Sequence, residues 1–160
     1  MKILGVDPGY GRVGFGVVDR RGGVLVPLRH GVIETSAKLD LPARLKQVHD
    51  SVAALIESDE PDCLATERLL FAANRTTGIG VASALGVVLL AAAERSVPWT
   101  EYTPPQVKLA VTGSGRAAKS QVQFMVTRLL RLQECPKPDD VADALAVAIC
   151  HALRAGIPTP

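Results

Sequence analysis

The sequence has few aromatic residues, few cysteines and no apolar run long enough to cross a membrane. Aromatic side chains make up only 4% of its 160 residues, which argues against nucleic-acid binding by a broad stacking platform. The three cysteines, Cys63, Cys135 and Cys150, show no CxxC spacing and predict reduced thiols in the cytoplasm. The apolar stretch over 79–93 is interrupted by glycine and serine and is too short for a membrane span, and the apolar start before Asp7 is too short for a signal peptide.

A surplus of one charge sign is also missing. The chain has 18 Lys and Arg against 16 Asp and Glu, so a nucleic-acid partner would require basic residues that are concentrated locally. Hydrophobic residues are abundant, at 48%. We therefore expect residues 1–160 to form a single domain with its own core and a frayed tail at 156–160.

Hydrophobic periodicity predicts three antiparallel strands at the start of the chain. The first covers 2–7 and ends at a Pro-Gly turn signal. The second covers 14–20 and is followed by a Gly-Gly pair that is typical of a hairpin. The third covers 24–35, and we expect a break in it near 29–31.

Helical and strand patterns alternate in the rest of the chain. Apolar residues at steps of three and four predict an amphipathic helix from Leu41, with Asp40 or Ser36 as its N-cap. The whole pattern predicts an α/β fold with a five-stranded mixed sheet flanked by helices. The other expected elements are strands over 62–67 and 97–103 and helices over about 74–95, 106–111, 120–132 and 139–153.

Four acidic residues stand where these elements would bring them together. Asp7 ends the first strand and Glu67 the fourth, and strand ends at one edge of an α/β sheet are the usual place for a ligand. Asp140 and Asp143 share a face at the start of the last helix. Carboxylates without His or Cys select Mg²⁺ or Mn²⁺. Two such ions can promote phosphodiester hydrolysis without a covalent nucleophile.

Each acid also has a plainer interpretation. Asp7 could be only a turn former, and Glu67 a solvated strand end. Asp139 or Asp140 could cap the last helix, and we assign the cap to Asp139. Asp143 lies near the apolar stripe of that helix, where an unpaired carboxylate is costly, so the joint pattern favours a metal site.

The run Gly9–Gly14 matches GxGxxG, the fingerprint of a dinucleotide site. That site requires a helix to begin at the glycines, whereas the residues after Gly14 have the pattern of a strand. We expect these glycines instead to shape a hairpin and to let a phosphate backbone approach.

Six segments in order span nearly the whole chain: LGVDPG at 4–9, LPARL at 41–45, ATE at 65–67, QVK at 106–108, KSQV at 119–122 and DVADALA at 140–146. In this order they resemble the RuvC-type Holliday-junction resolvases. The resemblance implies a ribonuclease H-like fold, a homodimer, and symmetric nicking of two opposed strands of a four-way DNA junction in recombination and repair. It also implies cooperation with a junction-binding and branch-migration complex of the RuvA–RuvB type.

The resemblance also assigns roles to individual residues. A wedge that enters the junction is implied three residues after the glutamate of the fourth strand, where Leu70 stands and Phe71 follows. Either side chain could unstack bases. The family's four catalytic acids, which bind two Mg²⁺ ions per site, fall on Asp7, Glu67, Asp140 and Asp143. Its two active-site lysines fall on Lys108 and Lys119.

Basic residues near the expected crevice are candidates for contacts with DNA phosphates. Lys108, Arg116 and Lys119 surround a glycine-containing loop, where they could neutralise phosphates. Amides of Ser114 or Gly115 could bind the same groups. The weaker candidates for positioning the DNA backbone are Arg12, Arg68 and Arg75.

The long helix over 74–95 has two faces of different character. Gly78, Ala82 and Gly86 recur at steps of four and predict close packing on the sheet of the protein itself. The other face could form a two-fold interface, and its apolar residues are Ile79, Val81, Leu85 and Leu89.

Three other functions are compatible with parts of the sequence. A related ribonuclease H-like nuclease could act on RNA or on other branched DNA. A binding module could recognise junctions without cutting, although the full set of acids argues against it. An actin-like nucleotide phosphotransferase also opens with an aspartate and glycines, but it needs two lobes and 160 residues supply one.

Overall fold

Strands and helices alternate along the part of the chain that the computed structural model describes. This part comprises residues 1–9, 11–69 and 75–155, without the side chains of 75–77. The predicted α/β class is confirmed, with small shifts at the ends of elements. The strands are β1 (Lys2–Asp7), β2 (Arg12–Arg21), β3 (Val24–Glu34), β4 (Cys63–Glu67) and β5 (Trp99–Tyr102), and the helices are α1 (Leu41–Asp59), α2 (Arg75–Glu94), α3 (Pro104–Thr112), α4 (Lys119–Leu129) and α5 (Asp139–Arg154).

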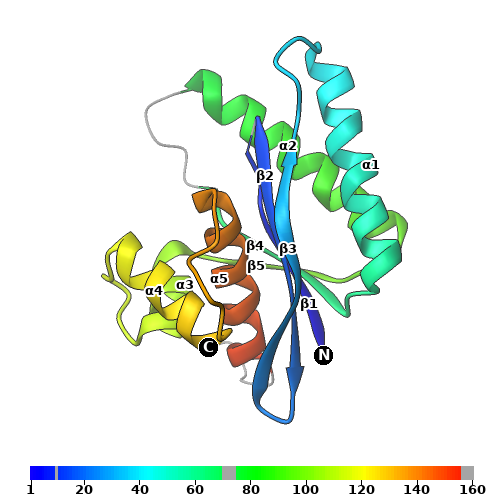
Figure 1. Ribbon diagram of the computed structural model, residues 1–160. Coiled ribbons are helices and arrows are strands. Elements are labelled where there is room, and N and C mark those ends of the chain that lie inside the picture. Colours follow the sequence, from blue (N-terminus) through cyan, green and yellow to red (C-terminus); the bar gives the residue numbers. More distant parts are fainter. Residues whose placement is uncertain (10, 70–74, 156–160) are drawn as a thin grey trace.

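The five strands form one mixed sheet in the order β3-β2-β1-β4-β5. β2 pairs antiparallel with β1 and β3, whereas β4 pairs parallel with β1 and β5. The helices α1 and α2 lie on one side of the sheet, and α3, α4 and α5 lie on the other (Figure 1). The predicted mixed sheet flanked by helices is therefore confirmed.

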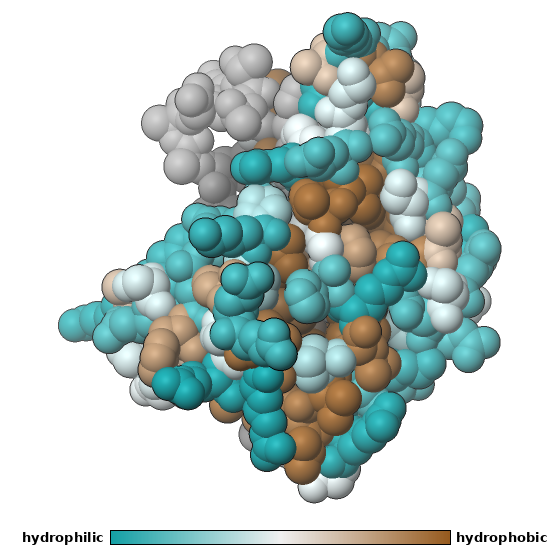
Figure 2. All heavy atoms as spheres, viewed as in Figure 1, coloured by the Kyte–Doolittle hydropathy of each residue, from teal (hydrophilic) through white to brown (hydrophobic). Residues whose placement is uncertain are grey.

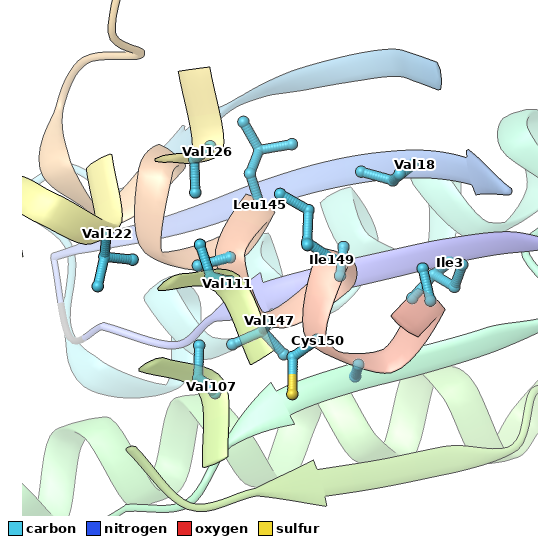
Figure 3. Close-up of a cluster of buried hydrophobic side chains, with 14 of the residues drawn as sticks. Ile3, Val18, Val107, Val111, Val122, Val126, Leu145, Val147, Ile149 and Cys150 are labelled. Carbon is cyan, nitrogen blue, oxygen red and sulfur yellow. The ribbon is translucent and has the colours of Figure 1, made fainter. Parts of the chain in front are cut away.

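Each face of the sheet has its own hydrophobic core. Neighbouring residues of a strand point to opposite faces, so Ile3 belongs to the core beneath α5 and Leu4 to the core beneath α1 and α2. In the first core, Leu145 and Ile149 of α5 meet valines from α3 and α4 (Figure 3). Because α5 is buried along most of its length, its position relative to the sheet is fixed.

Three glycines allow α5 to approach the sheet closely. A Cβ atom on Gly5 of β1 would lie 2.1 Å from the carbonyl oxygen of Ala144, and one on Gly14 of β2 would lie 2.0 Å from that of Asp140. A Cβ on Gly16 would meet the side chain of Leu145 at 2.4 Å. Gly14 therefore serves the packing of α5, and the expectation that the glycines over 9–14 admit a phosphate backbone stays a prediction. We call Gly5, Gly14 and Gly16 the glycine seat of α5.

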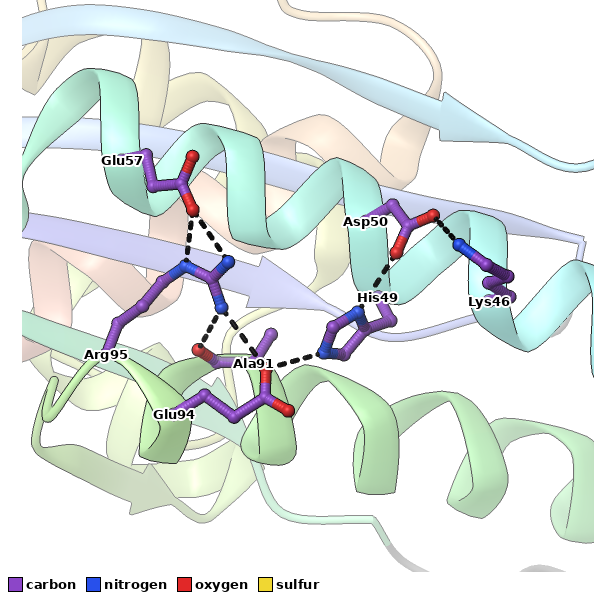
Figure 4. A network of polar contacts seen from close by, with 7 residues as sticks. All are labelled: Lys46, His49, Asp50, Glu57, Ala91, Glu94 and Arg95. Carbon is purple, nitrogen blue, oxygen red and sulfur yellow. Dashed lines mark hydrogen bonds and ion pairs between the residues drawn. The ribbon is translucent and has the colours of Figure 1, made fainter.

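The helix α1 is capped and then tied to α2 by polar side chains. Asp40 accepts a hydrogen bond from the backbone N–H of Ala43 at 3.0 Å, which decides between the two predicted caps. Further along, Arg95 donates from Nε and Nη2 to Glu57 at 3.0 and 2.7 Å (Figure 4).

A histidine adds a second link between these helices. His49 of α1 contacts Glu94 of α2 at 2.9 Å and Asp50 at 3.2 Å (Figure 4). Hydrogen bonds with Asp50 and then with Glu94 raise the pKa of His49, because both carboxylates favour the charged ring.

The helix α2 differs from its predicted orientation. Gly86, expected to pack on the sheet, is exposed, and a Cβ atom on it would meet nothing within 4 Å. Leu89, expected on the outer face, packs partly against the core, whereas Leu90 is exposed. Ile79 is exposed as predicted. The actual buried stripe includes Ala84, Val88 and Ala91.

The strand β3 is continuous, so the predicted break near 29–31 is wrong. The irregularity lies in its pairing with β2, where the register shifts between Val17 and Val18. Val18 faces Pro27, which has no N–H to donate and disturbs the ladder without ending the strand. A proline and a register shift also make this edge strand a poor template for pairing with another chain.

The face of the molecule seen in Figure 1 has a band of hydrophobic side chains down its middle, between hydrophilic margins (Figure 2). Val24 and Leu28 of β3 are among the exposed hydrophobic residues of the chain. In the described part of the chain, no helix has both the length and the apolar character that a membrane crossing demands.

Candidate active site

Two of the predicted acids are placed by the register of the sheet. Asp7 is the last residue of β1, and Glu67 is the last residue of the parallel neighbour β4. Val6 lies opposite Thr66, so both carboxylates leave the sheet at the same edge. This confirms the expected proximity of the two strand ends.

The other two acids arrive with the first turns of α5. Asp7 faces Gly14 across the β1–β2 ladder, and the backbone of Asp140 packs on Gly14. The glycine seat therefore sets the start of α5 directly beside the end of β1. Asp143 follows one turn later and lines the same cleft as Asp7 and Glu67.

The cleft has a volume of about 310 Å³ and combines acidic and basic side chains. Lys108 reaches it from α3, and Lys119 reaches it from the first position of α4. Asp140 stands at its edge and is not among the lining residues. The lining residues are Asp7, Glu67, Pro104, Val107, Lys108, Lys119, Val122, Asp143, Ala146 and Val147.

The acids perturb one another strongly. Burial, followed by the charges of Asp143, Asp140 and Glu67, raises the pKa of Asp7 to about 7. Burial and then Asp143 also raise the pKa of Glu67. Carboxylates that resist ionisation in each other's presence form a site in which positive charge is strongly favoured.

Lys119 supplies part of that positive charge. Its Nζ donates to Asp143 at 2.9 Å and lies 3.3 Å from Asp139. Partial burial opposes the protonation of Lys119, but the hydrogen bonds and charges of these two acids outweigh it and raise the pKa. Lys108 and Lys119 both lower the pKa of Glu67 and thus act on the same cleft.

Asp139 does not cap α5, so that prediction is wrong. The N-cap position is Pro138, and Asp139 is already the first residue of the helix. Its carboxylate turns toward α4 and accepts a hydrogen bond from Gln123 at 3.1 Å, beside Lys119. These partners on α4 draw the side chain away from the backbone amides of its own helix.

The predicted DNA contacts are distributed around this edge of the molecule. Arg12, the first residue of β2, pairs with Asp140 at 3.4 Å, and Arg68 pairs with Glu101 at 2.7 Å. Arg116 lines a separate hollow of about 410 Å³ together with Ser114 and Phe124. Leu70, Phe71 and the side chain of Arg75 lie outside the described residues.

The oxygen donors of the site fit a hard divalent cation. Asp140 Oδ2 is buried and accepts no hydrogen bond from any described residue, although Arg12 lies 3.4 Å from it. A buried carboxylate oxygen without a hydrogen bond can still bind a cation. In the described ranges, no three acids, histidines or cysteines enclose an ion by themselves. Mg²⁺ keeps several waters and takes one or two carboxylates together with substrate phosphates, so an open set of carboxylates fits it.

Sequence reasoning identified the acids and lysines but missed the groups that place them. The glycine seat has a recognisable signal, because Gly14 and Gly16 share one strand face and Ala144 and Ala148 lie one helical turn apart on α5. The ion pair between Arg12 and Asp140 has no such signal, since it depends on how β2 and α5 meet.

Three comparisons with known proteins agree with one another. A family model described as "Crossover junction endodeoxyribonuclease RuvC" matches residues 3–151. The protein of that name from Brevibacillus brevis is 54% identical over 152 residues, which cover 95% of this chain and 92% of that protein. Its namesake from Thermotoga petrophila is 49% identical, covering 96% and 93%. The structure of Thermus thermophilus RuvC in complex with Holliday junction substrate is 38% identical and superposes with a TM-score of 0.93, covering 97% and 94%.

Proposed function

This chain belongs to the RuvC family of crossover junction endodeoxyribonucleases, and on that premise we propose how its cleft performs the reaction. The fold is ribonuclease H-like, and the protein resolves Holliday junctions by cutting DNA. The observation that carries the proposal is the convergence of Asp7, Glu67 and Asp143 with two lysines in one cleft.

We propose that Asp7, Glu67, Asp140 and Asp143 hold two Mg²⁺ ions per site, with Mn²⁺ as a substitute. The raised pKa of Asp7 and the Oδ2 of Asp140, which is buried and accepts no hydrogen bond from a described residue, support this assignment. Bound ions of this kind activate water and stabilise the oxygen that leaves the phosphodiester. The sheet register and the glycine seat hold the acids in place.

The lysines act on the DNA phosphate. In the proposed reaction Lys108 and Lys119 oppose the negative charge that grows on the phosphate oxygens in the transition state. Lys119 is held by Asp143, so its ammonium group is oriented before the substrate arrives. Asp139 lies 3.3 Å from the lysine and accepts a hydrogen bond from Gln123, so both are positioning residues.

The substrate surface extends beyond the cleft. We assign contacts with the DNA backbone to Arg12, Arg68 and Arg116, whose side chains are exposed enough to reach phosphates. Leu70 or Phe71 enters the junction as the wedge, and Arg75 completes this set; all three remain expectations, since they fall outside the described side chains.

Symmetric cutting of two strands requires two sites, so we propose a homodimer. Ile79 and Leu90 support it as exposed apolar residues of α2, with Gly86 open between them. A cytoplasmic location with chromosomal DNA, and cooperation with a branch-migration complex of the RuvA–RuvB type, complete the proposal.

The test is strand-specific mapping of cuts on a synthetic mobile four-way junction in Mg²⁺. We expect paired nicks at symmetric positions on two opposed strands, and slower cutting of flaps and RNA–DNA hybrids. Asp7→Asn should bind the junction without cutting it. Asp50→Asn, an exposed acid on α1, is the matched control and should cut normally.

The other functions predict different results. Equal cutting of RNA hybrids or flaps would indicate a nuclease of other branched substrates. Binding without metal-dependent nicking in the unaltered protein would indicate a recognition module. Normal cutting by Asp7→Asn would show that the acids are assigned wrongly.

A further inference from the structure

One oxygen atom in the site is approached by a cation but not satisfied by it. Asp140 Oδ2 is buried and accepts no hydrogen bond within the described ranges. The nearest cationic group is Arg12, whose Nη2 lies 3.4 Å away, at a distance typical of an ion pair rather than of a charge-assisted hydrogen bond. The oxygen is therefore neutralised in part while its bonding capacity stays open.

Arg12 can leave this position easily. Its backbone is fixed as the first residue of β2, but its side chain is 53% exposed. The partner side chain of Asp140 is only 26% exposed and belongs to the buried helix α5. Of the two partners, the arginine is thus the movable one.

Lys119 of α4, in contrast to Arg12, is held closely by acids of α5. It donates to Asp143 at 2.9 Å and is also within 3.3 Å of Asp139. Two acids and a short hydrogen bond hold the lysine in the cleft, whereas one long ion pair holds Arg12 at its edge. The two cations therefore differ in how readily a metal ion could displace them.

We propose that Arg12 is a positioning residue that forms an ion pair with Asp140 in the metal-free enzyme and moves away when a divalent cation binds Oδ2 of Asp140. The inference rests on the proposed metal role of Asp140. Cation and guanidinium compete for the same oxygen, so each weakens the hold of the other.

Release of Arg12 has a consequence for DNA. A guanidinium freed at the edge of the cleft is available to a phosphate of the substrate backbone. The metal ion and the junction can each bind fully only when the ion pair between Arg12 and Asp140 is open. Whichever ligand binds first opens this pair, so the second ligand no longer has to open it. Arg12 thereby couples metal binding to junction binding in a reciprocal way.

The first test is calorimetric titration of the full-length protein with Mn²⁺ in the absence of DNA. We expect Arg12→Gln to bind Mn²⁺ about two- to fivefold more tightly, the range that an exposed ion pair supports. Arg12→Lys, which keeps the charge, should stay close to the unaltered protein. Arg21→Gln is the matched control, because Arg21 forms an ion pair with Asp19 at the far end of the same strand.

The second test measures junction affinity by fluorescence anisotropy in EDTA and in saturating Ca²⁺. The gain in affinity on adding Ca²⁺ should be smaller in Arg12→Gln than in the unaltered protein and in Arg21→Gln. Unchanged or weaker Mn²⁺ binding by Arg12→Gln, or an unchanged Ca²⁺ gain, overturns the inference. Absence of Mn²⁺ binding by the unaltered protein instead overturns the metal site itself, so the two failures are distinguishable.

Discussion

Asp7 contributes to the site at the expense of stability. Burial and the neighbouring acids raise its pKa from 3.8 to about 7, so between these values the folded chain binds more protons than the unfolded chain. The free energy of unfolding of the metal-free protein should therefore fall as pH rises from 3.8 to about 7. Ionisation of Asp7 should not restore stability at higher pH. We expect Asp7→Asn to raise the free energy of unfolding at pH 8 in EDTA by up to about 4 kcal/mol. Urea unfolding between pH 4 and 8 measures this.

Two comparisons make that experiment specific. Mg²⁺ should stabilise the unaltered protein at pH 8 and should stabilise Asp7→Asn much less, because the variant lacks one ligand. Asp50→Asn removes an acid whose pKa is lowered, chiefly by its hydrogen bond with Lys46, and should not stabilise the fold. A less stable Asp7→Asn would contradict the electrostatic account.

Lys119 should matter more for the rate of cutting than for binding. Replacing it with Gln removes the cation that faces Asp143 and that we propose to act on the scissile phosphate. We expect the single-turnover cleavage rate to fall about 100-fold, with a smaller loss of junction affinity. Lys137→Gln, which removes an exposed lysine outside the cleft lining, is the control. Equal rates for both variants would rule out the proposed role of Lys119.

At the residue scale, the sequence predicted five of the side chains that line the cleft, and Asp140 at its edge, but not their individual partners. The acids stand at strand and helix ends, and such positions can be inferred from periodicity. The pairing of Asp139 with Gln123 and Lys119 depends on the distance between α4 and α5. No local pattern encodes that distance, so Asp139 was wrongly predicted to be a helix cap.

At the level of elements, the glycine seat should be intolerant of a single methyl group. Gly14→Ala would place Cβ 2.0 Å from the backbone of Asp140, which must then move away from Asp7. We expect loss of at least about 2 kcal/mol of stability together with loss of cutting. Gly86→Ala is the control, because its Cβ meets nothing and alanine favours the helix by about 0.5–1 kcal/mol. Thermal unfolding of both variants reports the contrast in stability, and a cleavage assay of Gly14→Ala reports the loss of cutting. An active, stable Gly14→Ala would refute the prediction.

The link between α1 and α2 should depend on pH. The pKa of His49 is raised by Asp50 and Glu94, so its contribution is complete below the unfolded pKa near 6.5 and is lost as pH rises through the folded value. His49→Gln should therefore destabilise the protein at pH 5.5 and have little effect at pH 9. Urea unfolding at both values measures it, and a loss that does not change with pH would exclude the charged ring as its cause.

The order and type of the elements followed from hydrophobic spacing, but two details did not. Pro27 distorts the β2–β3 pairing without ending β3, because tertiary packing holds the strand on both sides of the distortion. On α2, apolar residues occur all round the helix, so spacing alone could not separate the buried Val88 from the exposed Leu90.

For the whole molecule, the proposed dimer can be tested through α2. The side chains of Ile79 and Leu90 are 65% and 51% exposed, and a charge at either position would be buried in a two-fold interface. We expect Leu90→Glu to sediment as a monomer and to lose paired cutting. Phe124→Glu is the matched control for sedimentation alone, since Phe124 is 57% exposed on α4 and lines the hollow of Arg116. A dimeric Leu90→Glu, or a monomer produced only by Phe124→Glu, would move the interface elsewhere.

The seating of α5 has a last consequence, which concerns how such an enzyme can change. The helix α5 packs at the centre of one hydrophobic core and also bears Asp140 and Asp143. These two acids therefore cannot change position without disrupting the packing of that core. Substitutions that alter the substrate preference or the cleavage rate are therefore expected in segments around the cleft, such as the loop around Ser114 and Arg116. To engineer the substrate preference of this nuclease, the residues of α5 should be kept and those of the surrounding segments substituted.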